Sequence, residues 1–197
     1  VPEGQYQLSG PVDFQKHWVI LRGDKVKRSN ITYGSAGRLR ITSGFTLKYL
    51  NIDCDALGPD VTDAAMILMS STPDPGILNT SYNSYYIINK NIEITSCNLN
   101  NINRRVLTDA NVKYCIANFK IEDCIISLKT LNDASGGIIY MQGGFINNFT
   151  IKNSTVWGSA KTGGYFLRYN NSGRPDRAGF TSGSINFLNN TFYNVVY

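Results

Sequence analysis

Few side chains in this sequence offer the chemistry of an active site. Its one histidine is His17, so a nucleophilic mechanism of the Ser-His-Asp or Cys-His kind would depend on that residue alone. Four aspartates are grouped at Asp53, Asp55, Asp60 and Asp63. Calcium binds about six to eight oxygen ligands, but these aspartates lack the spacing of a defined calcium loop. The sequence therefore predicts no cofactor and no metal site, with calcium as the weaker alternative, and it assigns no catalytic residue.

Arginines are the first candidates for a binding site. Arg105 opens one β-rich run and Arg168 closes another, so we expect both guanidinium groups to face one groove. Arg174 and Arg177 lie in an insertion rich in Gly, Asn and Ser, a common position for a binding loop. The formal net charge of +5 favours an acidic polymer as ligand. The basic residues are scattered, and no Lys/Arg cluster with interleaved aromatics indicates nucleic acid.

Aromatic rings are the second candidates. Trp157 and Tyr193 each follow directly on a copy of a repeated phrase, so they occupy equivalent positions one coil apart. Rings on an elongated β surface provide apolar faces against which flat sugar faces can pack. We expect Trp157 to lie on the same lateral face as Arg105 and Arg168, where the three would form a shallow carbohydrate-binding groove.

The repeated phrase is eight residues long and occurs five times. Each copy has apolar residues at its first, third and eighth positions and a small or apolar residue at its sixth. The copies begin at Leu47, Ile92, Phe119, Phe149 and Ile185. Their starts lie 45, 27, 30 and 36 residues apart. Self-similarity at a spacing of roughly 20–50 residues is typical of solenoids and other repeat architectures.

Alternation within the phrase indicates strands and not helices. Apolar residues at the first and third positions alternate as in a strand, and the step to the sixth position marks a bend before alternation resumes. A second β-rich run follows each of the first four copies. The sequence therefore predicts an all-β fold, a right-handed parallel β-helix built as a single-stranded solenoid of about five coils.

The phrase does not occur near the start of the chain. Residues 1–37 are expected to form an N-terminal cap or an irregular first coil, and residues 38–197 the parallel β-helix. The last copy of the phrase is followed by few residues, so the sequence stops inside an expected coil. An uncovered coil exposes unpaired backbone groups. We therefore expect a fragment of a longer chain, or contacts with neighbouring modules or with other chains end to end.

Stacking the copies predicts specific neighbours, because adjacent parallel strands lie about 4.8 Å apart. Glu93 would sit between Lys48 and Lys120, and Glu122 would sit beside Lys152. Opposite charges in adjacent positions favour this alignment, although exposed pairs contribute only about 0–1 kcal/mol each.

Three rows of equivalent positions have expected roles. Inward-pointing residues are Phe119, Ile121, Phe149, Ile151, Ile185 and Phe187. The fifth positions, expected at a corner, are Asn51, Ser96, Asp123, Asn153 and Asn189. The sixth positions, expected as an interior ladder that caps backbone groups at the bend, are Ile52, Cys97, Cys124, Ser154 and Asn190.

Cysteine positions and composition bear on the compartment. The four cysteines are expected to be small buried side chains, with a Cys97–Cys124 disulfide as the alternative.

Charged residues are only 17% of the chain, and uncharged polar residues are plentiful, which suits an extracellular or periplasmic β protein. The chain begins with Val1 and contains no secretory or transmembrane segment, so a removed signal would not be seen. We expect a secreted, periplasmic or outer-membrane-surface protein.

Two copies of the phrase carry a family resemblance. Residues Phe119–Ser127 and Phe149–Trp157, each followed by a glycine-containing β run, resemble the pectate-lyase-like β-helix domains of unknown function in exported Bacteroidetes proteins. The resemblance covers residues 38–197. It implies a surface or periplasmic protein of polysaccharide-utilising bacteria, often one module of a larger lipoprotein.

These observations predict a non-catalytic carbohydrate-binding or scaffold role, with an acidic polysaccharide favoured as partner. One alternative is a polysaccharide lyase acting on a uronate-containing glycan, which would need a proton acceptor that no repeated position supplies. Another is a structural, adhesin-like spacer that needs no groove. Binding without turnover is favoured, and whether the chain is an enzyme stays open. No nucleic-acid partner and no membrane span are expected.

Overall fold

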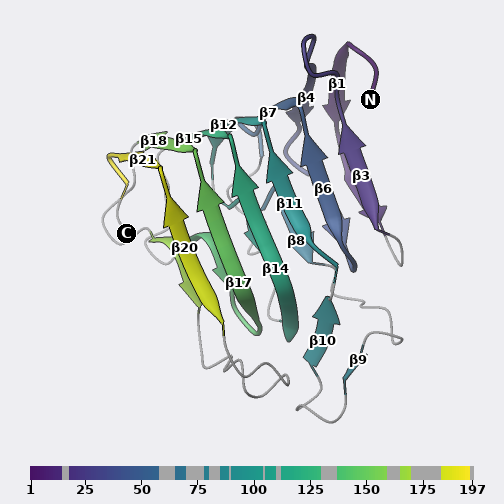
Figure 1. Ribbon diagram of the computed structural model, residues 1–197. Helices are drawn as coiled ribbons and strands as arrows, with labels where there is room; N and C mark the ends of the chain where they lie inside the picture. The colour runs from purple at the N-terminus through teal and green to yellow at the C-terminus, as the bar shows by residue number, and fades with distance from the viewer. Residues whose placement is uncertain are drawn as a thin grey trace.

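The structure is a computed structural model of the 197-residue chain. It describes residues 1–14, 18–57, 65–69, 78–79, 85–88, 90–103, 105–109, 112–129, 137–158, 165–169 and 183–195. These residues form strands, turns and loops, and no helix occurs among them (Figure 1). The prediction of an all-β fold is confirmed for this part of the chain.

The strands are arranged in three sheets. Sheet A contains, in order, β1 (Gln5–Leu8), β4 (Ser29–Tyr33), β7 (Leu50–Asp53), β12 (Asn98–Ile102), β15 (Ile125–Leu128), β18 (Thr155–Gly158) and β21 (Thr191–Tyr193). Sheet B contains β2 (Pro11–Phe14), β5 (Arg38–Ile41), β8 (Ile67–Met69), β13 (Leu107–Thr108), β16 (Gly137–Met141) and β19 (Tyr165–Tyr169). Sheet C contains β3 (Val19–Arg22), β6 (Phe45–Lys48), β11 (Ile92–Thr95), β14 (Tyr114–Glu122), β17 (Phe145–Lys152) and β20 (Ser184–Leu188).

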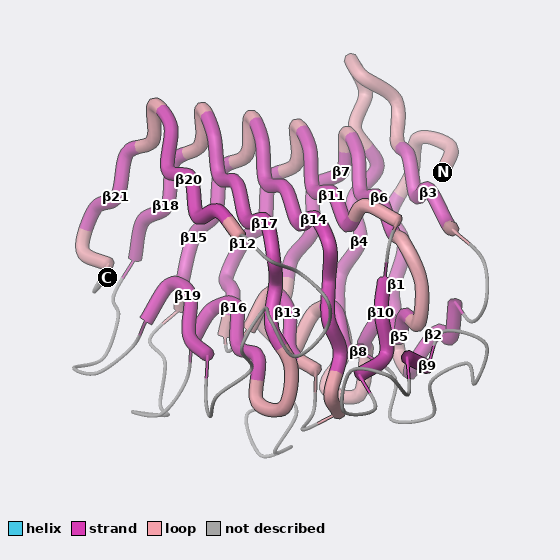
Figure 2. The backbone as a smooth tube through the Cα atoms, turned by 60° about the horizontal axis from the view of Figure 1, so that its bottom comes forward, coloured by secondary structure: helices cyan, strands magenta, loops and turns pink. Residues whose placement is uncertain are grey.

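The chain visits the sheets in a fixed cyclic order. It passes from sheet A to sheet B to sheet C and then returns to the next strand of sheet A, and neighbours within each sheet pair in parallel. A short branch departs from this order, because β10 (Tyr85–Ile88) pairs in parallel with β14 and antiparallel with β9 (Leu78–Asn79). Successive turns of the chain lie side by side, with the two termini at opposite ends (Figure 2). This arrangement agrees with the predicted parallel β-helix.

The core lies between the three sheets and is built from the inward rows of the phrase. Phe119 and Phe149 are partners in register and are buried, with ring centroids 5.6 Å apart. Ile121 and Ile151 are likewise paired and buried. Within the phrase, the alternation of β14 and β17 thus places every second side chain in the core, as predicted, whereas the residues that open both strands are buried without alternation.

The last strand of sheet C only partly follows this prediction. Ile185 and Phe187 are in register with Phe149 and Ile151, but they are 53% and 46% exposed. The Phe187 ring faces the core, with its centroid 6.0 Å from that of Phe149. The opposite side of the ring is exposed because β20 is the outermost described strand of sheet C, so no described strand covers it.

At five of the six described corners between sheets C and A, one residue adopts a left-handed backbone conformation. The corner residues are Tyr49, Ser96, Asp123, Asn153 and Asn189, with φ between 49° and 57°. Their N–H groups continue the ladder between turns, as in the hydrogen bonds from Ser96 N to Glu122 O at 2.9 Å and from Asn153 N to Leu188 O at 2.9 Å. Asn and Asp tolerate this conformation better than most residues, which explains the short polar side chains of the fifth position.

The first copy of the phrase is shifted by two residues from its predicted position. Ile92 pairs with Phe45 and not with Leu47, so Tyr49 replaces Asn51 at the corner. A shift of two residues leaves the inward and outward sides of a strand unchanged, and both Phe45 and Leu47 are apolar. The hydrophobic pattern therefore cannot distinguish the two alignments.

The shift also changes two expected neighbours. Glu93 lies beside Thr46 and Lys120, and Lys48 lies beside Thr95. The prediction that Glu93 sits between two lysines is therefore confirmed for Lys120 and wrong for Lys48, whose place is taken by Thr46. Ile52 belongs to the eighth-position row, as the partner of Leu99.

The sixth positions form the predicted interior ladder, with Leu50 in place of Ile52. Ser154 is buried, accepts a hydrogen bond from Cys124 N at 3.1 Å and donates one to Lys152 O at 2.8 Å. The Asn190 side chain accepts from Ser154 N at 2.9 Å and donates to Ile151 O at 2.9 Å. Hydroxyl and amide groups thus satisfy backbone groups at the bend.

The four cysteines are buried and free, as expected for small core side chains, and the alternative Cys97–Cys124 disulfide is not formed. Burial raises the pKa of Cys97 to about 11 and that of Cys124 to about 12. Burial also raises the pKa values of Cys54 and Cys115. All four side chains are therefore neutral thiols near pH 7.

The N-terminal strands join the same three sheets. β1, β2 and β3 pair in parallel with β4, β5 and β6. Residues 5–14 and 18–33 thus continue the solenoid, although they lack the complete phrase. The division of the chain at residue 37 stays a prediction.

Removing the buried Phe149 ring should be costly. We expect Phe149→Ala to lower the free energy of unfolding by about 3–5 kcal/mol, because the ring is buried and its loss leaves a cavity. Phe187→Ala is the control, and its loss should be clearly smaller because that ring is 46% exposed. Urea denaturation followed by circular dichroism measures both values. Equal losses would contradict the described packing.

The corner makes a separate prediction. Asn153→Val should lower the free energy of unfolding by about 1–2 kcal/mol, because a β-branched residue is strained at a φ of 49°. Asn153→Gly is the matched control, since glycine enters this region without strain. Thermal unfolding measures both variants. If the glycine variant is the less stable of the two, the left-handed backbone conformation is not the reason why asparagine stands at position 153.

Candidate functional site

Arg105 and Arg168 come together on sheet B around a tyrosine ring. The guanidinium carbon of Arg105 lies 4.6 Å from the Tyr140 ring centroid, and that of Arg168 lies 5.4 Å from it. Arg168 is the register partner of Tyr140 and also lies 5.4 Å from the Tyr165 ring centroid. We call Arg105, Tyr140 and Arg168 the arginine stack. It brings together the two arginines that the sequence analysis selected.

Burial separates the roles of the two arginines. Arg105 and Tyr140 are only 4% and 6% exposed, whereas Arg168 is half-buried and Tyr165 is 41% exposed. Cation–π contacts of desolvated guanidinium groups are stabilising by about 2 kcal/mol. Arg105 therefore packs against sheet B, whereas Arg168 and the neighbouring Tyr165 are the more exposed side chains of this region.

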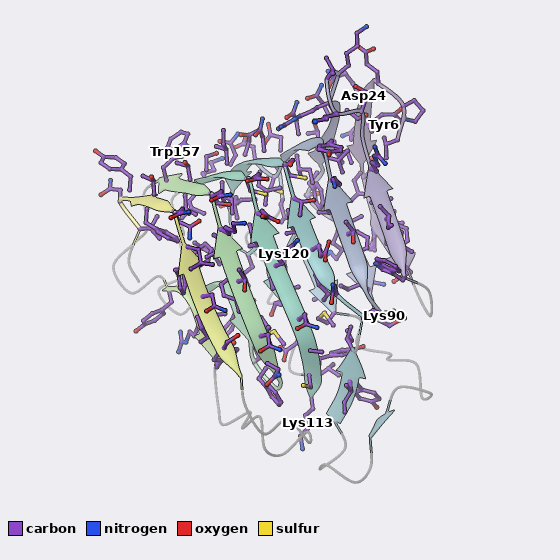
Figure 3. The ribbon with its side chains drawn as sticks, in the orientation of Figure 1. Tyr6, Asp24, Lys90, Lys113, Lys120 and Trp157 are labelled. Carbon is purple, nitrogen blue, oxygen red and sulfur yellow. The ribbon has the colours of Figure 1, made fainter. Side chains whose placement is uncertain are left out.

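Trp157 and Tyr193 lie on the outer face of a different sheet. They are register partners on β18 and β21 of sheet A, and they are 49% and 69% exposed. We call this pair the aromatic platform. Figure 3 shows Trp157 at the upper edge of the molecule, apart from Lys120, which lies over the strands of sheet C. The expected single groove of Trp157 with both arginines is not formed, because Arg168 lies on β19 of sheet B and Arg105 contacts Tyr140 of the same sheet, whereas Trp157 lies on sheet A.

Hydroxyl and apolar side chains surround the aromatic platform. Thr155 and Thr191 are register partners two residues before the rings and on the same outward side. Ile125, the partner of Thr155, is 48% exposed. The platform is therefore part of a mixed apolar and hydroxyl surface that crosses neighbouring strands of sheet A.

Gly158 fixes the end of β18 beside the platform. Its φ is 142°, and a Cβ atom at this position would lie 2.4 Å from the carbonyl oxygen of Leu128. Only glycine allows this close approach of β18 to β15 directly after Trp157.

The remaining predicted residues contribute little to a described site. Arg174, Arg177, His17, Asp60 and Asp63 lie outside the described residues. Asp53 accepts hydrogen bonds from Asp55 N at 2.9 Å and from Asn101 Nδ2 at 3.2 Å, and Asp55 pairs with Lys129. Within the described ranges, no three His, Cys, Asp or Glu side chains are grouped so that they would hold a metal ion.

A polar groove on sheet C was missed by the sequence analysis. Its volume is about 410 Å³, and a row of asparagines runs along it. Asn118 donates to Asn91 at 3.3 Å, and Asn148 donates to Asn118 at 3.1 Å. These residues directly precede copies of the phrase, so the sequence does contain a signal for this row.

A charged network lies next to this groove. Glu122 is in contact with two lysines, Lys120 Nζ at 3.1 Å and Lys152 Nζ at 3.1 Å. The predicted neighbours Glu122 and Lys152 are thus confirmed. Hydrogen bonds from Lys120 and then Lys152 lower the pKa of Glu122 below its ordinary value. The carboxylate is therefore ionised and occupied by the lysines near neutral pH.

Comparison with known proteins defines the family. The sequence profile of a domain of unknown function, DUF4957, matches residues 4–159, which is most of the chain. The chain belongs to the DUF4957 family. The matched part runs from the first strand of sheet A through β18, so it contains Trp157 but not Tyr193. No curated protein and no solved structure matches the chain.

One buried carboxylate of this DUF4957 domain has a structural role. Asp109 is buried, and its oxygens accept hydrogen bonds from Gln142 N at 2.7 Å, Gly143 N at 3.0 Å and Gly144 N at 2.6 Å. Three backbone donors hold this side chain in the turn between β16 and β17. Asp109 therefore anchors that turn.

The DUF4957 domain has no candidate membrane helix in its described part, since no helix there is long and apolar enough to cross a bilayer.

The lysine contacts of Glu122 predict a pH-dependent contribution to stability. At pH 7, Glu122→Gln should lower the free energy of unfolding by about 0.5–1 kcal/mol, because the side chain is only partly exposed and pairs with two lysines. Because the folded-state pKa is lowered, this contribution is complete above the unfolded pKa near 4.5 and is lost as the pH falls towards the lowered value. Thermal unfolding of both proteins between pH 7 and pH 3 measures the difference.

Glu93→Gln is the matched control on β11, since the Glu93 carboxylate accepts from Asn91 at 3.0 Å. A Glu122→Gln deficit that stays constant down to pH 3 would show that the lysine contacts are not its cause.

Proposed function

We propose that this DUF4957 domain is a right-handed, pectate-lyase-like parallel β-helix that acts outside the cytoplasm and binds carbohydrate without chemical turnover. Handedness is supported by a general rule for parallel sheets. A connection that leaves a sheet and returns to an adjacent parallel strand is right-handed in nearly all proteins. Every passage from one strand of sheet C to the next is such a connection.

The aromatic platform is the observation that carries the proposed binding function. Two aromatic side chains in adjacent register positions are 49% and 69% exposed on a lateral face. Leaving large apolar rings in water has no benefit for folding, and grouped exposed apolar side chains are typical of interaction sites. The C–H faces of a sugar ring can cover Trp157 and Tyr193, and the hydroxyl groups of Thr155 and Thr191 can bond to sugar hydroxyls.

An acidic polysaccharide is the proposed ligand class. The formal net charge of +5 raises the local concentration of a polyanion around the whole domain. Arg168, with Tyr165 beside it, supplies an accessible cation on sheet B. This long-range attraction weakens as salt is added, whereas stacking on the rings does not.

A titration with uronate-containing oligosaccharides tests the proposal. Trp157→Ala and Tyr193→Ala should each weaken binding by about 0.5–1.5 kcal/mol, which is up to about tenfold in Kd. Trp18→Ala is the matched control, because Trp18 is 54% exposed but precedes β3 at the far end of the solenoid. Calorimetry at low and at physiological ionic strength separates stacking from charge attraction.

Three results would change the conclusion. Absence of binding at low ionic strength would favour the alternative of a structural spacer. Equal losses for Trp157→Ala and Trp18→Ala would place the site elsewhere. Ultraviolet absorbance from unsaturated uronate products would favour the polysaccharide-lyase alternative, in which a basic side chain removes a proton from the sugar.

A further inference from the structure

The polar groove on sheet C lies apart from the aromatic platform of sheet A. It crosses β11, β14 and β17, which are inner strands of their sheet, with β6 on one side and β20 on the other. Figure 1 shows these strands side by side on one broad face. Two parallel rows of outward side chains line the groove. The first row is Asn91, Asn118 and Asn148, and the second is Glu93, Lys120 and Thr150.

The asparagine row is a preorganised chain of hydrogen bonds. Asn148 donates to Asn118 at 3.1 Å, and Asn118 donates to Asn91 at 3.3 Å. Asn91 in turn donates to the Glu93 carboxylate at 3.0 Å. The amides therefore point the same way, and hydrogen bonds in such a chain strengthen one another. Each side-chain amide has two N–H groups and two acceptor lone pairs, so each turn has a further donor and a further acceptor that a ligand can use.

A β-bulge lies beside this row. β10 and β11 both pair with β14, and the register places Ile88 opposite Ile116. It places Ile92 opposite Phe119. Three residues separate Ile88 from Ile92, whereas two separate their partners, and Asn91 is the last of the three. Bulges redirect side chains and are over-represented next to functional sites.

The charges of the second row favour an uncharged ligand. Lys120 Nζ contacts Glu122 at 3.1 Å, although its register partner on β11 is Glu93. Among the described residues, no cation forms an ion pair with Glu93. Its carboxylate is therefore suited to accept charge-assisted hydrogen bonds from hydroxyl groups. A ligand carboxylate in the same place would be repelled.

Spacing distinguishes a sugar chain from a peptide as the ligand. Adjacent turns lie about 4.8 Å apart, so the asparagine row offers a donor and an acceptor at this interval. An extended peptide presents equivalent groups on one side only at every second residue, which is about 6.6–7.2 Å. One hexose unit of an extended chain is close in length to the spacing of the turns, and its hydroxyl groups both donate and accept.

We propose that this groove is a second binding site, whose ligand is an uncharged, hydroxyl-rich oligosaccharide lying across β11, β14 and β17. The asparagine amides donate to and accept from the sugar hydroxyls, one turn for each sugar unit. Glu93 accepts hydrogen bonds from a pair of hydroxyls and rejects uronates. The site lies on a different sheet from the aromatic platform and selects a ligand of different charge, so it does not depend on the proposed function.

Titration with uncharged glucose oligosaccharides of one to six β-linked units tests the proposal. NMR spectra of the side-chain N–H groups should show shifts for Asn91, Asn118 and Asn148, while the Trp157 indole signal reports separately on the aromatic platform. Affinity should rise up to about three units, one for each turn of the groove, and then level off. Added salt should leave the affinity unchanged, because the ligand is uncharged.

A matched pair of variants locates the site. Asn118→Leu removes the middle amide of the row at similar side-chain volume and should weaken binding about five- to tenfold. Asn51→Leu is the control, since Asn51 is the middle amide of an equivalent chain on sheet A. It donates to Asn30 at 2.9 Å and accepts from Asn98 at 3.0 Å. This control should bind the oligosaccharide as the unmodified chain does.

Glu93→Gln tests the charge argument. It should weaken binding of the glucose oligosaccharides and strengthen binding of a uronate oligosaccharide in the groove, because the repelling charge is gone. Circular dichroism confirms that each variant is folded. If Asn118→Leu is not, Thr150→Val replaces it, since that change removes one hydroxyl of the groove and should weaken binding about threefold.

Four results would overturn the proposal. One is a titration in which no asparagine signal of the groove shifts, including one in which only the Trp157 signal does. Another is equal weakening by Asn118→Leu and Asn51→Leu. A third is tighter binding of a uronate oligosaccharide than of the glucose oligosaccharide in the groove of the unmodified chain. A fourth is tighter binding of an uncharged, serine-rich peptide, which would assign the groove to a protein segment.

Discussion

The left-handed corner between sheets C and A is the constraint on which the rest of the structure depends. At five of the six described corners one residue takes a φ near 50°, and in four of them its N–H group still bonds to the next turn. The chain can therefore change direction without losing a ladder hydrogen bond, which would be costly in the buried wall of a solenoid. Because a strand alternates on each side of the corner, this one residue decides which neighbours face the core and which face solvent. Lys152 and Trp157 face outward for this reason, on either side of Asn153.

Much of the interior could be predicted from the sequence because it repeats with the phrase. Phe149 in the core and Ser154 in the interior ladder both follow from their positions in one eight-residue pattern. The first copy was placed two residues too late, since Phe45 and Leu47 satisfy the same alternation. Hydrogen bonds in register distinguish these alignments, whereas hydrophobicity does not.

The candidate site was harder to predict because some of its residues belong to the repeated phrase and others to the β-rich runs that follow it. Trp157 could be placed next to Tyr193 from the phrase alone. Arg105 lies before a β run that has no such phrase, so nothing in its surroundings indicated that it would be buried on Tyr140. The corner between sheets A and B carries no repeated pattern either, and for this reason Trp157 was expected on the face of the arginines. The asparagine row on sheet C was missed because the phrase is defined by its apolar positions. The asparagines are polar and recur one residue before the phrase begins.

The four buried thiols have a consequence for the redox chemistry of the folded domain. A solenoid whose turns are joined by hydrogen bonds and packed rings gains its cohesion without any covalent cross-link between turns. Thiols with strongly raised pKa values hold little thiolate, and thiolate is the species that attacks disulfides and oxidants. The folded domain therefore holds no disulfide that a reductant could break, and its buried thiols are poor nucleophiles towards oxidants and disulfides.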